Sequence, residues 1–246
     1  LLRAIDQGII VLAATGRPLT GVPEEILKLP GIRYALTSNG ARIVDLEKQE
    51  VIYEAVMPVD TARKVLDVFA RYDTYKEIFI AGTGYSSSCE LDKVEQYVLL
   101  ESMACYMRAC RVPVRDVYEK LEQENKPVDK VHALFRNMEE REKALREIEE
   151  IPGTAPTGAM ANNIEVNAYG VNKGVGLIKL GEILGIQREE IMACGDGMND
   201  LEMLREAGVG VAVENAVQAV KDAADYITDT NENEGVAKAI EKIALA

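Results

Sequence analysis

The sequence has no uninterrupted apolar run near the ~20 residues that a membrane-spanning helix requires, so we expect no membrane partner. Basic residues are also scarce, because 28 Lys and Arg stand against 41 Asp and Glu, for a formal net charge of −13. This balance argues against a polyanionic partner such as nucleic acid. An anionic ligand would need local positive charge from a metal or from a few basic side chains.

Histidine and cysteine are too few and too scattered to predict a metal site. The only histidine, His132, lies in an apolar run, VDKVHALF, that indicates a strand and favours a structural role over a catalytic one. The four cysteines, Cys89, Cys105, Cys110 and Cys194, lack the spacing of metal ligands. We expect reduced, packed thiols in a cytoplasmic protein.

What is present indicates a folded globular chain of one to two domains. The 246 residues are 48% apolar and 28% charged, and the chain has no low-complexity tract.

The stretch 191–215 carries the strongest functional signal. Ile191–Cys194 predicts a buried strand, 195–197 a tight turn, Met198–Ala207 a helix and Val209–Val213 a second strand. Asp196 and Asp200 therefore follow the carboxyl end of a strand, where open α/β sheets bind ligands. Either aspartate alone would suggest a capped turn. Two glycines, two aspartates and Asn199 within six residues favour a site for a hard cation such as Mg²⁺.

Two further strand ends carry polar turns. Ile9–Ala14 predicts an apolar strand, and Thr15-Gly16-Arg17 follows with a hydroxyl and backbone N–H groups that could cradle a phosphate. Tyr34–Thr37 predicts another strand that leads into Asn39-Gly40. This pair predicts a hairpin turn first and a ligand contact second.

Lys173 opens the helix predicted within 170–184, where a positive charge opposes the helix dipole. An anionic ligand at this N-terminus would explain the lysine. The alternative is an exposed lysine without a ligand.

Four phrases, ATGR at 14–17, SNGA at 38–41, VNKG at 171–174 and GDGMND at 195–200, resemble the motifs of the haloacid dehalogenase (HAD) superfamily, in the wording of its Cof-type sugar-phosphate phosphatases. Ion pumps carry a phrase similar to the last one, but the absence of a membrane-spanning run removes that reading. The resemblance implies Mg²⁺ held directly by Asp196, with Asp200 as a ligand through water or as an anchor. Lys173 would neutralise the phosphoryl oxygens. Thr15, Gly16 and Asn199 would bind the phosphate, with Arg17 and Asn39 as further substrate contacts.

The resemblance also implies a fold: an α/β core with a doubly wound parallel sheet, formed by 1–57 and 169–246, and an inserted α+β cap domain over 58–168. Within the cap the sequence predicts helices and strands, which are Asp60–Tyr72, Pro113–Glu124 and Met138–Glu150 as helices and Glu77–Ile80, Val128–Phe135 and Ala161–Asn167 as strands, with an irregular region at 82–101. After the 191–215 stretch we expect a helix at Ala216–Ala224 capped by Asn215, a strand at Tyr226–Thr228 and a helix at Gly235–Ile243.

The nucleophile and general acid of this superfamily are two aspartates in a DxDGT-like loop, and none of the aspartates of this sequence lies in such a loop. The segment 1–7 predicts the tail of a helix that would follow that loop. We therefore expect the biological protein to be longer by about one βα unit, roughly 20–35 residues.

The sequence thus predicts a Mg²⁺-dependent phosphatase that hydrolyses small phosphate monoesters, sugar phosphates first, through an aspartyl-phosphate. A phosphotransferase or mutase on the same core, and a non-catalytic protein that binds a phosphorylated metabolite, stay open as alternatives. The sequence does not predict an oligomeric state.

Overall fold

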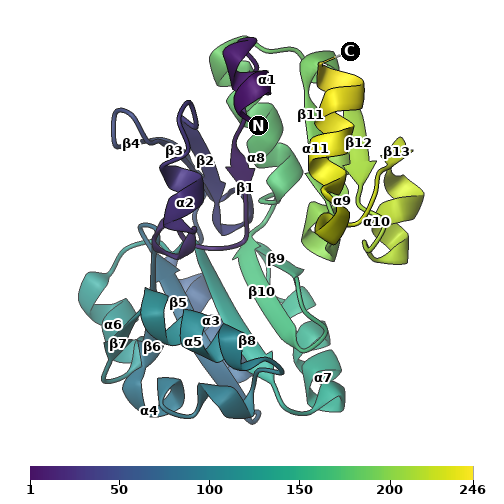
Figure 1. Cartoon of the computed structure of the whole chain (residues 1–246). Helices are drawn as coiled ribbons and strands as arrows, with labels where there is room; N and C mark the ends of the chain where they lie inside the picture. The colour runs from purple at the N-terminus through teal and green to yellow at the C-terminus, as the bar shows by residue number, and fades with distance from the viewer. Residues whose placement is uncertain (246) are drawn as a thin grey trace. The chain divides into compact units, whose positions relative to one another are not determined.

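The computed structural model describes residues 1–245, which divide into two compact units (Figure 1). Unit 1 comprises 1–16, 23–54 and 172–246, and unit 2 comprises 17–22 and 55–171. The core range predicted from the sequence, 1–57 with 169–246, and the predicted cap range, 58–168, remain predictions and are not identical to these two units.

Unit 1 contains two hydrogen-bonded sheets. The first has the order β1-β2-β3-β4. Its strands are β1 (Ala13–Ala14), β2 (Tyr34–Thr37), β3 (Arg42–Asp45) and β4 (Glu50–Glu54). The pair β1–β2 is parallel, whereas β2, β3 and β4 run antiparallel to one another. The second sheet is parallel throughout, in the order β11-β12-β13, with β11 (Met192–Gly195), β12 (Val209–Ala212) and β13 (Tyr226–Ile227).

The helices of unit 1 alternate with these strands. They are α1 (Leu2–Asp6), α2 (Glu24–Leu27), α8 (Lys173–Leu184), α9 (Leu201–Glu206), α10 (Gln218–Ala223) and α11 (Gly235–Ala239), which continues as a π-helical turn, Ile240–Ala244. One apolar cluster joins both sheets to α8, α9 and α10. It includes Leu36, Ile43, Leu180, Met203 and Val220. This shared core holds the carboxyl ends of β1, β2 and β11 in place.

Unit 2 is built on a six-stranded sheet in the order β7-β6-β5-β8-β10-β9. The strands are β5 (Thr74–Ile80), β6 (Thr83–Ser87), β7 (Arg111–Val114), β8 (Lys130–Phe135), β9 (Thr154–Thr157) and β10 (Asn163–Ala168). All neighbouring pairs are antiparallel except β6–β7. The helices are α3 (Val59–Phe69), α4 (Ser88–Leu91), α5 (Glu101–Cys110), α6 (Val117–Glu124) and α7 (Met138–Glu149).

Side chains alternate between the two faces of this sheet. Residues such as Ile78, Val131 and Ile164 pack with Leu66 of α3 and Leu121 of α6 in the main apolar cluster of unit 2, which also includes residues of α7. The other face carries a row of buried polar side chains. In register, Glu77, His132 and Glu165 are direct cross-strand neighbours.

Most predicted elements are confirmed, but several boundaries differ. The strand expected over 9–14 forms ladder pairs only at Ala13 and Ala14, which face Ala35 and Leu36. The helix expected over 198–207 begins as a 3₁₀ turn, η5 (Met198–Asp200), before α9. The region expected to be irregular contains β6 and α4, and the prediction placed no element on α5 or β9.

Two other expectations are wrong. Pro113 belongs to β7 rather than to the following helix, which begins at Val117 after Asp116 caps it. Asn215 is not the cap of α10, because that helix follows Val217, and the Asn215 Oδ1 accepts a hydrogen bond from the Asn231 N–H at 3.0 Å instead.

The four cysteines are free thiols, as predicted, although Cys89 and Cys105 are exposed rather than packed. Within residues 1–245, no helix combines the length and the apolarity that crossing a membrane requires.

Candidate active site

The polar turns after β1 and β2 lie side by side because these two strands are parallel. The Thr15 N–H donates to the Leu36 oxygen at 2.8 Å, and the Asn39 N–H donates to the Thr15 oxygen at 3.0 Å. The turn η2 (Ser38–Gly40) links β2 to β3, which confirms the predicted hairpin turn. Ser38 and Asn39 both have positive φ angles, 50° and 59°. Non-glycine residues in this region cost energy and cluster at functional sites.

The amino end of α8 lies against this hairpin turn. A Cβ added to Gly40, whose φ is +94°, would lie 2.3 Å from the backbone oxygen of Asn172, so only glycine allows this approach. The Asn172 side chain caps α8 by accepting from the Val175 N–H at 2.9 Å. Lys173, the first residue of the helix, is thereby fixed beside the ends of β1 and β2.

The turn after β11 is organised by the Asp200 carboxylate. One oxygen, Oδ2, accepts hydrogen bonds from the backbone N–H groups of Asp196 and Gly197, each at 3.0 Å. The other, Oδ1, accepts from the Lys173 Nζ at 2.6 Å. Both side chains of this ion pair are about 93% buried, with 7% of each exposed. The anion that the lysine at the helix start requires is thus supplied by the chain itself.

Asn199 connects the two halves of the site. Its Nδ2 donates to the Asn39 Oδ1 at 3.2 Å, across 160 positions of sequence. The structure therefore brings together Thr15, Asn39, Lys173, Asn199 and Asp200 at one edge of unit 1. Gly16 directly follows Thr15 in sequence, and Asp196 is tied to the group by the hydrogen bond from its backbone N–H to the Asp200 Oδ2 at 3.0 Å.

Asp196 directly follows β11 and is exposed. Its surroundings destabilise the ionised carboxylate. Partial desolvation raises the pKa of Asp196, the neighbouring Asp200 carboxylate raises it further, and Lys173 acts in the opposite direction. A cation at Asp196 would offset this cost, and Mg²⁺ prefers carboxylate oxygens. Asp200 fits a direct metal contact less well, since both of its oxygens already accept hydrogen bonds. No group of three or more His, Cys, Asp or Glu able to hold a metal occurs within residues 1–245.

Arg17, predicted as a substrate contact, clusters with unit 2 rather than with the residues above. Its Nη1 donates to the Gly21 oxygen at 3.3 Å, and its guanidinium lies 4.3 Å from the centre of the Tyr106 ring. The structure therefore gives Arg17 partners within unit 2, one in the segment that continues the Thr15-Gly16 turn and one on α5.

Thr37 was not singled out from the sequence. It ends β2 one residue beyond the Ala14–Leu36 pair, so it lies beside Thr15 in the parallel ladder. Its side chain is fully buried, and its Oγ1 has no hydrogen-bond partner in the part of the chain that the structure describes. Its place at a strand end, equivalent to that of Thr15, was the available signal.

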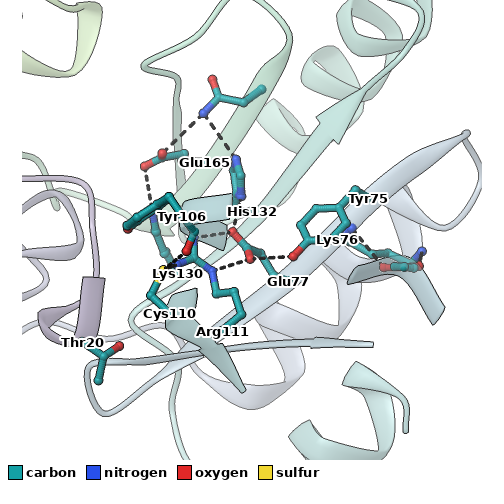
Figure 2. Close-up of polar contacts among 12 residues, drawn as sticks. Thr20, Tyr75, Lys76, Glu77, Tyr106, Cys110, Arg111, Lys130, His132 and Glu165 are labelled. Carbon is teal, nitrogen blue, oxygen red and sulfur yellow. Dashed lines mark hydrogen bonds and ion pairs between the residues drawn. The ribbon is translucent and has the colours of Figure 1, made fainter. Parts of the chain in front are cut away.

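Unit 2 carries a separate buried polar network (Figure 2). Glu77 on β5 accepts from the Arg111 Nε at 2.6 Å and Nη2 at 3.0 Å, and contacts the His132 Nδ1 at 2.6 Å. Burial raises the pKa of Glu77, but Arg111 and His132 together outweigh burial and hold it well below its usual value. Lys130 donates to Glu165 at 2.8 Å. The predicted structural role of His132 fits this setting.

The comparisons with known proteins decide the family. The family model described as haloacid dehalogenase-like hydrolase matches residues 1–240. The chain belongs to this family. The superfamily predicted from the sequence motifs is therefore confirmed.

Relatives of this HAD-like hydrolase span nearly the whole chain. A 5-amino-6-(5-phospho-D-ribitylamino)uracil phosphatase of Bacillus subtilis (strain 168) is 34% identical over 239 residues, or 96% of this chain and 83% of its own. A second phosphatase of that name and organism is 30% identical over 240 residues, or 96% of this chain and 85% of its own. The HAD-like hydrolase is thus a phosphoric monoester hydrolase, as predicted.

The fold class is also confirmed. The crystal structure of a haloacid dehalogenase-like hydrolase from Bacteroides thetaiotaomicron matches with a TM-score of 0.79 and 29% identity, and the match covers 98% of this chain and 89% of that one. The HAD-like hydrolase therefore has the predicted α/β core with a second, inserted α+β unit.

Proposed function

We propose that this HAD-family phosphatase hydrolyses a small phosphorylated metabolite with a sugar-like or polyol chain, with Mg²⁺ held at Asp196. One observation carries the proposal, which is the convergence of Thr15, Asn39, Lys173 and Asn199 beside the Asp196 turn. A phosphate there would meet the Thr15 hydroxyl, the Asn199 amide, the Gly16 N–H and the Lys173 ammonium, a set of donors suited to an anion.

Each residue of the proposed site has a separate role in binding the metal or the phosphate. Asp196 would hold the Mg²⁺, which when bound neutralises charge on the phosphoryl oxygens. Lys173 adds a second positive charge that Asp200 keeps in place, because the ion pair fixes the ammonium. Asp200 acts as the anchor of the Asp196 turn, since its Oδ2 holds two backbone N–H groups of that turn. Thr15, Gly16 and Asn199 orient the phosphate, and the aspartyl-phosphate route stays a prediction.

The first substrate to assay is 5-amino-6-(5-phospho-D-ribitylamino)uracil, because two relatives that span this chain carry that substrate in their names. Sugar phosphates are the second class, in keeping with the motif wording. An assay decides the substrate class, because the core residues described above would bind only the phosphate that all of these compounds share.

The deciding experiment measures phosphate release from both classes by the full-length protein, with Mg²⁺ and with EDTA. We expect Asp196→Asn to lower kcat/KM by at least about 10³-fold, as loss of a metal-binding carboxylate removes charge stabilisation worth several kcal/mol. The matched control is Asp222→Asn, an exposed aspartate whose side chain accepts a hydrogen bond from Gln218 on the same helix.

Equal activity of Asp196→Asn and the wild type would refute the metal assignment. Product formation that depends on an added acceptor alcohol would favour a phosphotransferase. Ligand-induced stabilisation without turnover in the wild type would favour a binding protein.

A further inference from the structure

The segment Arg17–Val22 directly continues the Thr15-Gly16 turn, yet it packs within unit 2. It contains the 3₁₀ turn η1 (Leu19–Gly21). The Thr20 N–H and the Thr20 hydroxyl both point at the Gly82 oxygen, at 3.4 and 3.3 Å. Gly16 is covalently bonded to Arg17, so this segment is the direct continuation of the phosphate-binding turn.

Tyr106 on α5 contacts the segment through its ring. The Arg17 guanidinium lies 4.3 Å from the centre of its ring, within the range of an attractive cation–π contact. Among the described residues the Tyr106 Oη makes no hydrogen bond to Arg17, and the groups that act on the pKa of this hydroxyl are Arg111 and Cys110. The contact with Arg17 is therefore made by the aromatic ring.

Tyr106 is itself held by neighbouring side chains within unit 2. The Arg111 guanidinium lies 5.5 Å from the centre of the same ring. Arg111 is held by a bidentate bond to the buried Glu77 and by a contact of its Nη1 with the Cys110 Sγ at 2.9 Å (Figure 2). It also lies 4.9 Å from the centre of the Phe79 ring. A side chain that packs on such a fixed group has little freedom to reorient.

Gly21 shows how closely the segment approaches Tyr106. A Cβ built on Gly21 would lie 2.3 Å from the Tyr106 Oη and 3.3 Å from Cζ. The first distance is impossible for real atoms, whereas the second is tight but tolerable. The backbone can take this path only while residue 21 has no side chain.

We propose that Tyr106 is a positioning residue for the phosphate-binding turn: it holds Arg17 and the Gly21 turn, and so fixes the chain that leaves Thr15 and Gly16. The kinetic part of this inference rests on the proposed phosphatase function. The structural part does not, because it concerns only contacts within unit 2.

The test compares Tyr106→Leu, which removes the ring, with Tyr106→Phe, which keeps it. Hydrogen exchange of the backbone over 17–22 reports on the segment without any need for activity. We expect Tyr106→Leu to accelerate this exchange at least about tenfold, since opening of the Thr20 hydrogen bond becomes easier, and Tyr106→Phe to match the wild type. Unchanged exchange in Tyr106→Leu would overturn the proposal.

Kinetics supply the second measurement. If Thr15 and Gly16 bind the phosphate in the ground state and the transition state alike, Tyr106→Leu should raise KM about fivefold with kcat changed less than about twofold, and Tyr106→Phe should restore the wild-type KM. Faster exchange with an unchanged KM would refute the positioning role.

A wild type without phosphatase activity would refute the proposed function alone. The dissociation constant of inorganic phosphate would then replace KM as the measurement. Weaker phosphate binding by Tyr106→Leu than by the wild type would support the inference, and equal binding would overturn it.

A double-mutant cycle tests the geometry even if Tyr106→Leu fails to fold. Gly21→Ala alone should accelerate exchange over 17–22, because its Cβ meets the Tyr106 hydroxyl. Gly21→Ala combined with Tyr106→Phe should return exchange toward the wild-type rate, since the colliding atom is gone. Equal effects of Gly21→Ala in both backgrounds would show that Tyr106 does not define the path of the segment.

Discussion

At the scale of single residues, the ion pair of Lys173 and Asp200 most clearly distinguishes the structure from the prediction. The position of the lysine at a helix start correctly indicated that an anion is required. The sequence could not indicate that Asp200, 27 positions later, supplies it, because that contact depends on how α8 packs beside the β11 turn. Asp200 was predicted as a metal ligand or an anchor, and its hydrogen bonds support the anchor.

This ion pair makes the first stability prediction. Lys173→Met leaves the Asp200 carboxylate buried without its cation, and breaking a buried pair costs about 3–5 kcal/mol. Urea unfolding should show a loss of that size. The control, Lys179→Met, removes an exposed pair with Glu182 on the same helix and should change stability by less than about 1 kcal/mol. Losses of similar size in the two variants would contradict the burial argument.

At the scale of elements, the sequence predicted those strands and helices that are apolar, periodic and bounded by glycine. Both edge strands of the unit 2 sheet escaped prediction, and each contains a proline: Pro113 in β7 and Pro156 in β9. Proline lacks an N–H, which argues against a strand in general but is tolerated at a sheet edge. Only the strand order reveals that these segments are edges.

The capped start of α6 provides a prediction at this scale. The Asp116 Oδ1 accepts from the N–H groups of Tyr118 and Glu119, at 2.7 and 3.1 Å. Asp116→Ala should destabilise unit 2 by about 0.5–2 kcal/mol, as loss of an N-cap does. Asp116→Asn keeps an acceptor oxygen and should restore most of that stability. Thermal unfolding of the two variants beside the wild type measures this, and equal losses would contradict a capping role.

At the scale of the whole molecule, the two units have separate apolar cores and separate polar networks. The motifs predicted unit 1 well, because the polar turns that carry them follow strand ends in a fixed order along the chain. They predicted little of the buried polar face of unit 2. Arg111 follows Glu77 by 34 positions and His132 follows it by 55. Only the pairing of the strands brings these residues together.

The Glu77 network should make the free energy of unfolding of unit 2 fall as the pH is lowered. The pKa of Glu77 is lowered in the folded state, so its ionised form stabilises the fold. This contribution is complete above the ordinary value of 4.5, declines as the pH falls below it, and is lost once the pH passes the folded pKa. The difference in unfolding free energy between wild type and Glu77→Gln should therefore shrink between pH 6 and pH 3. A difference independent of pH would refute this role.

The division of the chain has a consequence for building hybrid enzymes. Unit 2 consists of two pieces, 17–22 and 55–171, separated by α2 and the three strands β2, β3 and β4 of unit 1. A hybrid that exchanged only 55–171 would combine residues 55–171 of another protein with the native 17–22. The residue at position 106 would then no longer be matched to the close approach of Gly21. The two pieces therefore have to be exchanged together, and a hybrid enzyme must take both 17–22 and 55–171 from the same protein.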